Sequence, residues 1–140
     1  NTPFYTLSAV TSGVKDVREV IERASQNRFF DSPSPILFID EIHRFSKSQQ
    51  DSLLGAVEKG TVTLIGATTE NPSFEVIRPL LSRCQLYVLK SLGKDDLLDL
   101  LHRAITQDVE LKNYHIVLQD TGAILRYSGG DARKLLNILE

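Results

Sequence analysis

Residues 36–40, Ile-Leu-Phe-Ile-Asp, constrain the fold of this chain more than any other stretch. Four apolar residues follow one another without alternation, which is typical of a strand covered on both faces in a parallel sheet. Residues 62–67, Val-Thr-Leu-Ile-Gly-Ala, form a second run of the buried type. Strand and helix patterns alternate over residues 1–90, so the sequence predicts an α/β layer architecture built on a parallel sheet.

Two further stretches of residues 1–90 have strand character. Residues 4–7 are short and β-prone, and residues 86–89, Leu-Tyr-Val-Leu, are a third apolar run that we expect to form a strand. Between residues 74 and 82 we expect a short helical stretch interrupted by a proline.

Helix signals lie between the predicted strands. Apolar residues recur at helical spacing from Val14 to about Gln26, and Ser12 is the expected N-cap. Ser46 and Gln49 have the S-x-x-Q spacing of a capping box, which indicates a second helix ending near residue 60.

The pattern is helical throughout after residue 91. One amphipathic helix carries Leu97, Leu98, Leu101 and Ile105. Residues 123–127 indicate a second helix, and Asp131 can cap a third. We therefore expect an α/β core over residues 1–90 and a separate helical subdomain over residues 91–140.

Composition bounds the class of protein. At 140 residues the chain can bury a sizeable core, and its net charge of −2 offers no general positive charge for nucleic acid. No apolar run approaches the roughly 20 residues that span a bilayer. The single cysteine cannot form an internal disulfide, which fits a reducing compartment. The chain lacks methionine and its last residues have a helical pattern, so we expect it to be a segment of a longer protein.

The acidic pair Asp40 and Glu41 ends the first buried run. Asp40 at the carboxyl end of a strand is well placed to hold Mg²⁺, directly or through water, because hard cations take oxygen ligands. Glu41 could polarise a water for attack on a phosphate. The alternative is an acidic turn that merely closes a buried strand, and the pair alone does not decide between the two.

Polar residues also lie next to the other two apolar runs: two threonines follow the second run and an arginine precedes the third. Thr68 and Thr69 end the second run, so a hydroxyl would lie beside Asp40 if the two strands are parallel neighbours. It could hydrogen-bond a γ-phosphate or orient a water, although a threonine pair also simply ends strands. Arg83 comes just before the third run and could be a surface ion-pair partner or a permanently charged donor to transition-state phosphate.

Two other side chains stand at the ends of predicted elements. Arg133 lies in the first turn of the last helix, where a cation opposes the macrodipole, which favours an outside anion as its partner. His43 could ligate zinc only with about two further protein ligands. Because His102 and His115 lie far away in sequence, we favour a polar histidine at a strand–helix junction.

A family resemblance rests on four stretches, which in chain order read DEIHRFSKSQQD, IGATTENPSF, LLSRC and GGDARKLLN. Together they resemble the AAA+ ATPases of the clamp-loader and Holliday-junction-helicase group. With SAVTSGVKDVRE they look similar to the replication-associated recombination protein A family, whose eukaryotic relative is the Werner-helicase-interacting ATPase. The resemblance covers essentially the whole chain and implies a partial AAA+ parallel-sheet sandwich followed by an all-helical lid subdomain.

The resemblance implies roles for the residues near the strand ends. Asp40 and Glu41 match the Walker B acids, which serve Mg²⁺ and water activation. Thr69 matches the sensor 1 position, with Thr68 the less favoured choice.

It also implies roles for two arginines. Arg83 matches the arginine finger, which in AAA+ rings reaches the nucleotide of the neighbouring subunit. Arg133 matches sensor 2, which reaches the nucleotide from the lid.

The implied cofactors are ATP and Mg²⁺, and the implied partners are DNA and further copies of the same chain. The family works at stalled or damaged replication forks, so fork or single-strand-containing DNA is expected, with single-strand-binding protein or other replication proteins as further candidates and no membrane. The expected location is the cytoplasm, at the bacterial nucleoid, or the nucleus of a eukaryote. The chain departs from the family in one respect, since no G-x-x-x-x-G-K-[ST] loop occurs in it, and such a loop would precede Phe4. We therefore do not expect this chain alone to hydrolyse ATP.

Two other interpretations stay open. DEIH also satisfies the DExH box of helicases, but a helical region with GGDAR stands where a second RecA-like domain should follow. The chain would also fit a non-catalytic AAA+-like interaction module that binds partners but not ATP.

Overall fold

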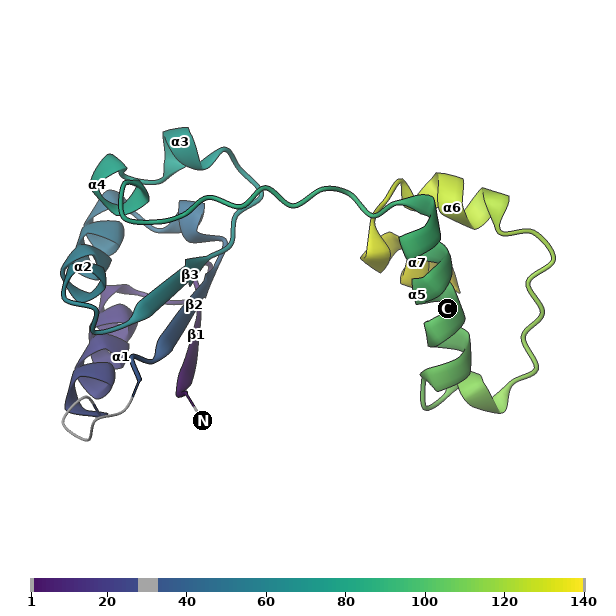
Figure 1. Ribbon diagram of the computed structural model, residues 1–140, viewed down its shortest axis with the longest axis horizontal. Coiled ribbons are helices and arrows are strands. Elements are labelled where there is room, and N and C mark those ends of the chain that lie inside the picture. The colour runs from purple at the N-terminus through teal and green to yellow at the C-terminus, as the bar shows by residue number, and fades with distance from the viewer. Residues whose placement is uncertain (1, 28–32, 140) are drawn as a thin grey trace. The chain divides into compact units, whose positions relative to one another are not determined.

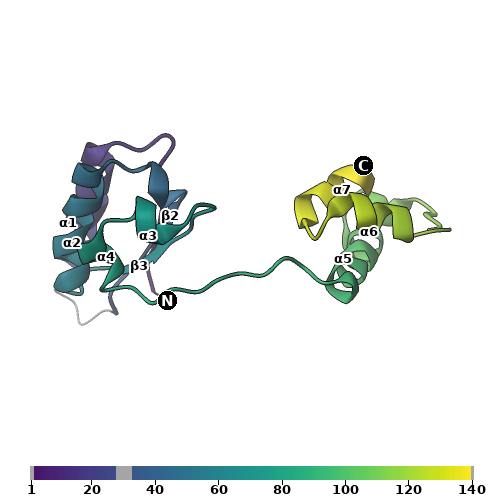
Figure 2. The same cartoon turned by 90° about the horizontal axis from the view of Figure 1, so that it is seen from above.

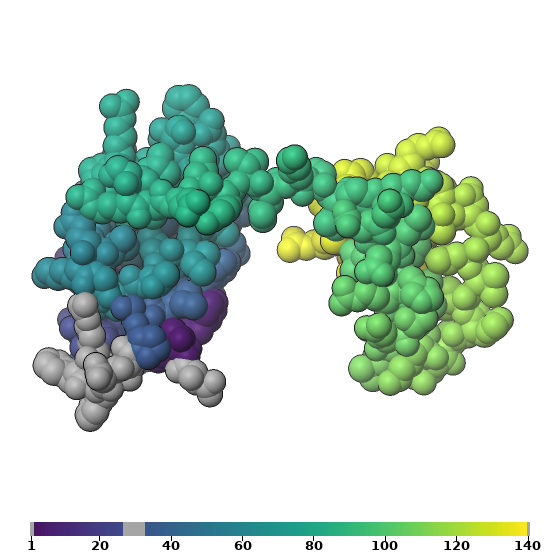
Figure 3. All heavy atoms as spheres, in the orientation of Figure 1, coloured from purple at the N-terminus to yellow at the C-terminus, as the bar shows by residue number. Residues whose placement is uncertain are grey.

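A computed structural model describes residues 2–27 and 33–139 of the chain. The chain divides into two compact units, Asn1–Leu86 and Tyr87–Glu140, whereas the expected division came after residue 90. We call them the first and the second unit and describe each by itself. The space-filling view shows that the atoms within each unit are closely packed (Figure 3).

The first unit is built on a parallel sheet of three strands, in the order β1-β2-β3 (Figure 1). The strands are β1 (Phe4–Ser8), β2 (Ile36–Asp40) and β3 (Thr63–Gly66). The prediction of an α/β fold on a parallel sheet is therefore confirmed.

The two faces of the sheet differ in how well they are covered. Leu37 and Ile39 of the central strand point into the core and are fully buried. Ile36 and Phe38 on the opposite face are only half-buried, and the Phe38 ring stacks on Phe4 with ring centroids 6.4 Å apart. The expectation of full cover on both faces is thus met on one face only in the described structure.

The core face is covered by two long helices that lie side by side in both ribbon views (Figures 1 and 2). The helical segments of this unit are α1 (Val14–Asn27), η2 (Ile42–Arg44), α2 (Lys47–Glu58), α3 (Pro72–Glu75) and α4 (Arg78–Leu81). Val17 of α1 and Leu53 of α2 are fully buried against β2 in one hydrophobic cluster. This packing fixes the strand ends that carry the acidic pair.

The structure confirms one predicted helix cap and corrects another. The capping box at α2 is present, with Ser46 Oγ accepting from Gln49 N at 3.3 Å and Gln49 Oε1 accepting from Ser46 N at 2.9 Å. The prediction of Ser12 as N-cap of α1 is wrong, because the helix begins at Val14. Gly13 occupies the position before the helix, and Asp16 in the first turn reaches back to it, with Asp16 Oδ2 accepting from Gly13 N at 2.6 Å.

The third apolar run is not a strand, contrary to the prediction. Residues 86–89 are extended coil in which every side chain is more than half exposed, and Figure 1 draws this stretch without an arrow. A strand needs a neighbour to pair its backbone groups, and in the described part of the chain none pairs with these residues. Apolar character alone could not reveal that no neighbour stands beside them.

The second unit is helical, as predicted. It contains α5 (Lys94–Gln107), η3 (Leu111–Asn113), α6 (Gly122–Ser128) and α7 (Ala132–Leu139). Leu97 and Leu101 of α5 and Leu135 of α7 form its buried core. Asp131 Oδ1 accepts from Lys134 N at 3.0 Å, which confirms the predicted cap of α7. Among the described helices, none combines the length and apolar character that crossing a membrane requires.

Candidate functional site

The candidate site lies where β2 and β3 end side by side. The two strands are parallel neighbours, as the sequence-based argument required, with Ile39 paired to Gly66. Backbone pairing continues past the strands, because Ala67 N donates to Ile39 O at 2.9 Å and Ile42 N donates to Ala67 O at 3.0 Å. A Cβ on Gly66 would lie 3.0 Å from Ile42 Cδ1, so the absent side chain makes room for Ile42. The turn after β2 is therefore held against the residues that follow β3.

Glu41 adopts an unusual backbone conformation at this turn. Its φ of 53° and ψ of 46° lie in the left-handed region, and no other non-glycine residue of the described chain has a positive φ. Such a conformation costs of the order of 1–3 kcal/mol, and it persists only where the surroundings enforce it. Buried Ile42 and the 3₁₀ turn η2 follow directly and anchor the chain on one side of it. The strained residue is one of the two predicted Walker B acids.

The Glu41 carboxylate is held by two side chains. Thr69 Oγ1 donates to Glu41 Oε2 at 3.3 Å, and His43 Nδ1 lies 3.1 Å from the same oxygen. His43 Nδ1 also lies 2.9 Å from Thr68 Oγ1. The side chains of Glu41 and His43 are 29% and 14% exposed, so both are partly screened from water. The sequence predicts a threonine hydroxyl beside Asp40, whereas in the structure Thr69 contacts Glu41 and Thr68 contacts His43.

Asp40 ends β2 with an exposed side chain. Its backbone carbonyl accepts from Ala9 N at 3.1 Å, while its carboxylate has no hydrogen-bond or ion-pair partner among the described residues. A single open carboxylate fits Mg²⁺ that arrives on substrate phosphates, because this ion keeps several waters and takes one or two protein carboxylates. The described residues contain no group of three or more His, Cys, Asp or Glu that would suit a metal site made of protein alone.

Arg83 follows α4 and lies apart from this cluster. Its guanidinium pairs with Glu58 of α2 at 2.6 Å and donates to Pro79 O at 2.7 Å. Both side chains of the ion pair are about two-fifths exposed, at 41% and 42%. Within the described structure Arg83 contacts none of the residues around Glu41, so it occupies the surface ion pair that was one of its two predicted roles.

Arg133 belongs to the second unit, where it lies exposed in the first turn of α7. Its charge and the backbone N–H of Lys134 both act on Asp131. The hydrogen bond from Lys134 N is the main cause that lowers the pKa of Asp131 from its ordinary value, and Arg133 adds a smaller effect of the same sign. No described residue offers the Arg133 side chain an acidic partner by hydrogen bond or ion pair.

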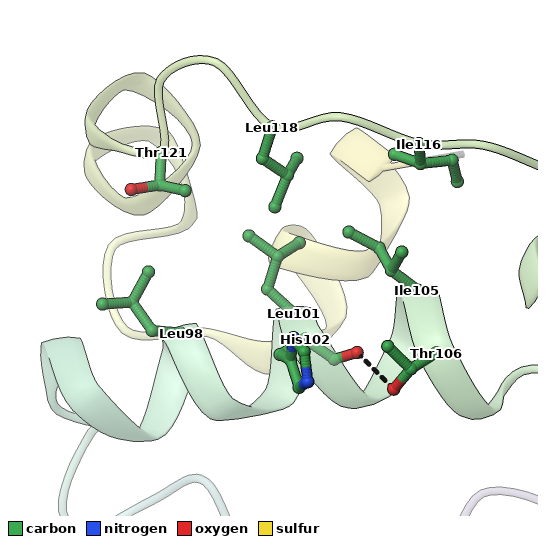
Figure 4. Close-up of a pocket in the computed structure, with 8 residues that line it drawn as sticks. All are labelled: Leu98, Leu101, His102, Ile105, Thr106, Ile116, Leu118 and Thr121. Carbon is green, nitrogen blue, oxygen red and sulfur yellow. Dashed lines mark hydrogen bonds between the residues drawn. The ribbon is translucent and has the colours of Figure 1, made fainter.

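The second unit also contains an apolar hollow of about 390 Å³ between α5 and the segment before α6. Figure 4 shows Leu101 and Ile105 of α5 pointing toward Leu118 and Ile116 across it. The remaining lining residues are Leu98, His102, Thr106 and Thr121. None of the predicted site residues lines this hollow, and among the residues that do, only His102 is titratable.

Sequence reasoning missed the place of His43 beside Glu41. The sequence predicts this histidine only as a zinc ligand or as a polar residue at a strand–helix junction. The i, i+2 spacing of Glu41 and His43 gives no signal for this contact, because a regular 3₁₀ turn brings residues i and i+3 together. The contact depends on the left-handed backbone of Glu41, which DEIH alone does not specify.

Comparison with known proteins gives a consistent result. Residues 3–92 match the family described as ATPase family associated with various cellular activities (AAA). Replication-associated recombination protein A of Escherichia coli K12 is 51% identical over the whole chain, and ATPase WRNIP1 of Dictyostelium discoideum is 45% identical over 96% of it. The chain spans 32% of the first relative and 15% of the second.

Solved structures of RuvB from Thermotoga maritima have a similar fold. The T158V variant superposes with a TM-score of 0.76 at 25% identity, covering 98% of this chain and 44% of that one. The structure titled RuvB Holliday junction branch migration motor gives a TM-score of 0.74 at 26% identity, with the same two coverages. These findings favour the AAA+ interpretation of DEIH over the DExH-box interpretation. The parallel sheet, with acids and hydroxyls at adjoining strand ends, agrees with that interpretation. This chain belongs to the AAA family of ATPases, because its sequence matches the family over residues 3–92.

Proposed function

We propose that this chain is the water-activating and nucleotide-sensing part of an ATPase that couples ATP hydrolysis to DNA transactions at replication forks. The observation that carries the proposal is the Glu41 carboxylate held between Thr69 and His43 at the ends of two parallel strands. Ligands of open α/β sheets bind outside the carboxyl ends of the strands, which is where this cluster lies. The names of the relatives, a recombination protein and a branch migration motor, support the DNA setting.

The proposed mechanism assigns separate tasks to the two acids. Mg-ATP, when bound, supplies the phosphate to be attacked and the metal charge that stabilises it. Asp40 would hold the metal ion through its open carboxylate. In the described structure Oε2 of Glu41 is occupied by Thr69 and His43, whereas Oε1 has no protein partner. Oε1 is therefore the oxygen that accepts a hydrogen bond from the attacking water and then its proton.

Arginines complete the proposed site from outside the cluster. Arg83 reaches the nucleotide of a neighbouring copy, for which it must leave Glu58. An exposed ion pair is worth only about 0–1 kcal/mol, so this pair opposes the exchange weakly. Arg133 reaches the nucleotide from the helical lid. The phosphate-binding loop is not in this sequence, so the chain alone is not expected to hydrolyse ATP.

The partners and location follow from the same proposal. We infer fork or single-strand-containing DNA, further copies of the chain in a homo-oligomer, and replication proteins such as single-strand-binding protein. The location is the cytoplasm of a bacterium or the nucleus of a eukaryote.

The division of labour between the acids is testable in the intact ATPase that carries this chain. Asp40→Asn should raise the Mg²⁺ concentration needed for half-maximal ATPase activity, because it weakens a metal ligand. Glu41→Gln should leave that concentration unchanged while lowering the maximal rate. Asp51→Asn, an exposed acid on α2, is the matched control and should change neither. Unchanged Mg²⁺ dependence in Asp40→Asn would contradict the metal assignment. If the intact protein bound DNA but no ATP analogue, the non-catalytic interaction module would be the better account.

A further inference from the structure

We propose that His43 and Thr68 are positioning residues that fix the Glu41 carboxylate for water activation. This inference rests on the proposed function, since it concerns how Glu41 is oriented for that task. The basis is a chain of contacts in which His43 Nδ1 lies 3.1 Å from Glu41 Oε2 and 2.9 Å from Thr68 Oγ1.

The carboxylate determines which nitrogen of His43 carries hydrogen. A carboxylate oxygen only accepts, so an unprotonated Nδ1 at 3.1 Å would set two lone pairs against each other. With hydrogen on Nδ1, the ring donates toward both Glu41 Oε2 and Thr68 Oγ1. Each of these oxygens can accept, so this is the hydrogen arrangement that the three side chains together allow.

Thr68 is itself held in place as the second support of the ring. Its Oγ1 accepts from Glu70 N at 3.0 Å and can donate to Glu70 O at 3.5 Å. This local turn orients the hydroxyl oxygen that receives the Nδ1 hydrogen. Thr68 therefore acts on His43, whereas Thr69 contacts Glu41 directly. The two adjacent hydroxyls have different tasks.

The need for such support follows from the backbone of Glu41. A left-handed glutamate could lower its conformational energy by relaxing toward another region, which would move the carboxylate. Contacts from His43 and Thr69 on one oxygen oppose that movement and leave the other oxygen for water. Displacing a catalytic group by about 1 Å can reduce a rate by about a hundredfold.

The test measures kcat and KM for ATP in the intact ATPase. His43→Leu should lower kcat by about tenfold to a hundredfold while KM stays within about twofold, because it affects the reacting carboxylate and not nucleotide binding. His43→Asn should recover most of the lost kcat, because its amide can donate from near the Nδ1 position. His115→Leu, at an exposed histidine of the second unit, should leave both constants unchanged.

The Glu41→Gln background separates this inference from the proposed function. If His43 acts through Glu41, then His43→Leu should lower kcat no further in Glu41→Gln. Equal losses in the two backgrounds would overturn the positioning role. Normal turnover in Glu41→Gln itself would instead overturn the proposed function. Slow Glu41→Gln with normal His43→Leu would overturn the positioning role alone.

A second variant covers the case in which His43→Leu fails to fold. Thr68→Val removes only the hydroxyl that holds the ring and should lower kcat by roughly threefold to tenfold with KM unchanged. Thr63→Val, on an exposed residue at the start of β3, is its matched control. Equal kcat in Thr68→Val and Thr63→Val, with both proteins folded, would overturn the proposal.

Discussion

Replacing Gln50 by methionine should destabilise the first unit by about 3 kcal/mol. The Gln50 side chain is 1% exposed, and it makes three hydrogen bonds to backbone groups of other segments. Its Nε2 donates to Phe45 O at 3.0 Å and to Glu75 O at 3.1 Å, and its Oε1 accepts from Ile77 N at 2.9 Å. At about 1 kcal/mol for each bond the loss is about 3 kcal/mol, since methionine keeps the length of the side chain but none of its polar atoms.

Amide hydrogen exchange of β2 is the suitable assay, because it reports on the first unit only. A loss of about 3 kcal/mol should accelerate exchange of the Leu37 and Ile39 amides by roughly a hundredfold, since 1.4 kcal/mol corresponds to a factor of ten. Gln26→Met, at an exposed residue of α1, should change the rates little. Acceleration of exchange in Gln50→Met by less than about fivefold, equivalent to about 1 kcal/mol, would refute the reasoning that these three bonds hold α2 to the turn before it and to the residues after β3.

Three further predictions concern the proposed role of Arg83, the cap of α7 and the turn before it. Mixing Arg83→Ala chains with Glu41→Gln chains of the intact ATPase should restore part of the ATPase activity, because some subunit interfaces then pair an intact Arg83 with an intact Glu41. No recovery of activity, despite demonstrated mixed assembly, would argue that Arg83 acts in cis. Because hydrogen bonding lowers the folded-state pKa of Asp131, the stability that this carboxylate gives to α7 should be fully present above its ordinary pKa of 3.8 and be lost as the pH falls below that value. Hydrogen exchange of the α7 amides, measured against pH in the parent chain and in Asp131→Asn, checks this. Identical pH profiles of the two proteins would contradict it. Gly130→Ala should lower the stability of the second unit more than Gly129→Ala. Both glycines have a positive φ, so either substitution should cost about 1–2 kcal/mol of folding free energy, but only at Gly130 would the new Cβ lie 2.9 Å from Ser91 Cβ. Equal melting temperatures of the two variants would refute the role of this close contact.

Local patterns predicted much of the first unit. The runs at 36–40 and 62–67 indicated adjacent parallel strands because their hydrophobic character reflects burial that the fold then provides. The Ser46–Gln49 capping box was predictable because both partners lie within one helical turn. The strand at 86–89 was predicted wrongly because pairing depends on a neighbour that is distant in sequence.

The candidate site was predictable in its members but not in its contacts. Asp40, Glu41 and the two threonines follow buried strands, so their proximity followed from strand adjacency. The contact of Thr69 with Glu41, rather than with Asp40, depends on the left-handed turn that redirects the glutamate. No local pattern in the sequence specifies a positive φ at a glutamate, because tertiary contacts enforce it.

The most direct test of the central claim is the single-turnover rate of ATP hydrolysis by Glu41→Gln in the intact ATPase, with ATP binding measured in parallel. We expect that ATP still binds and that the hydrolysis step slows by about 10²–10⁴-fold, which is the usual contribution of a positioned general base. Hydrolysis near the wild-type rate with ATP bound would contradict the claim that Glu41 activates the attacking water.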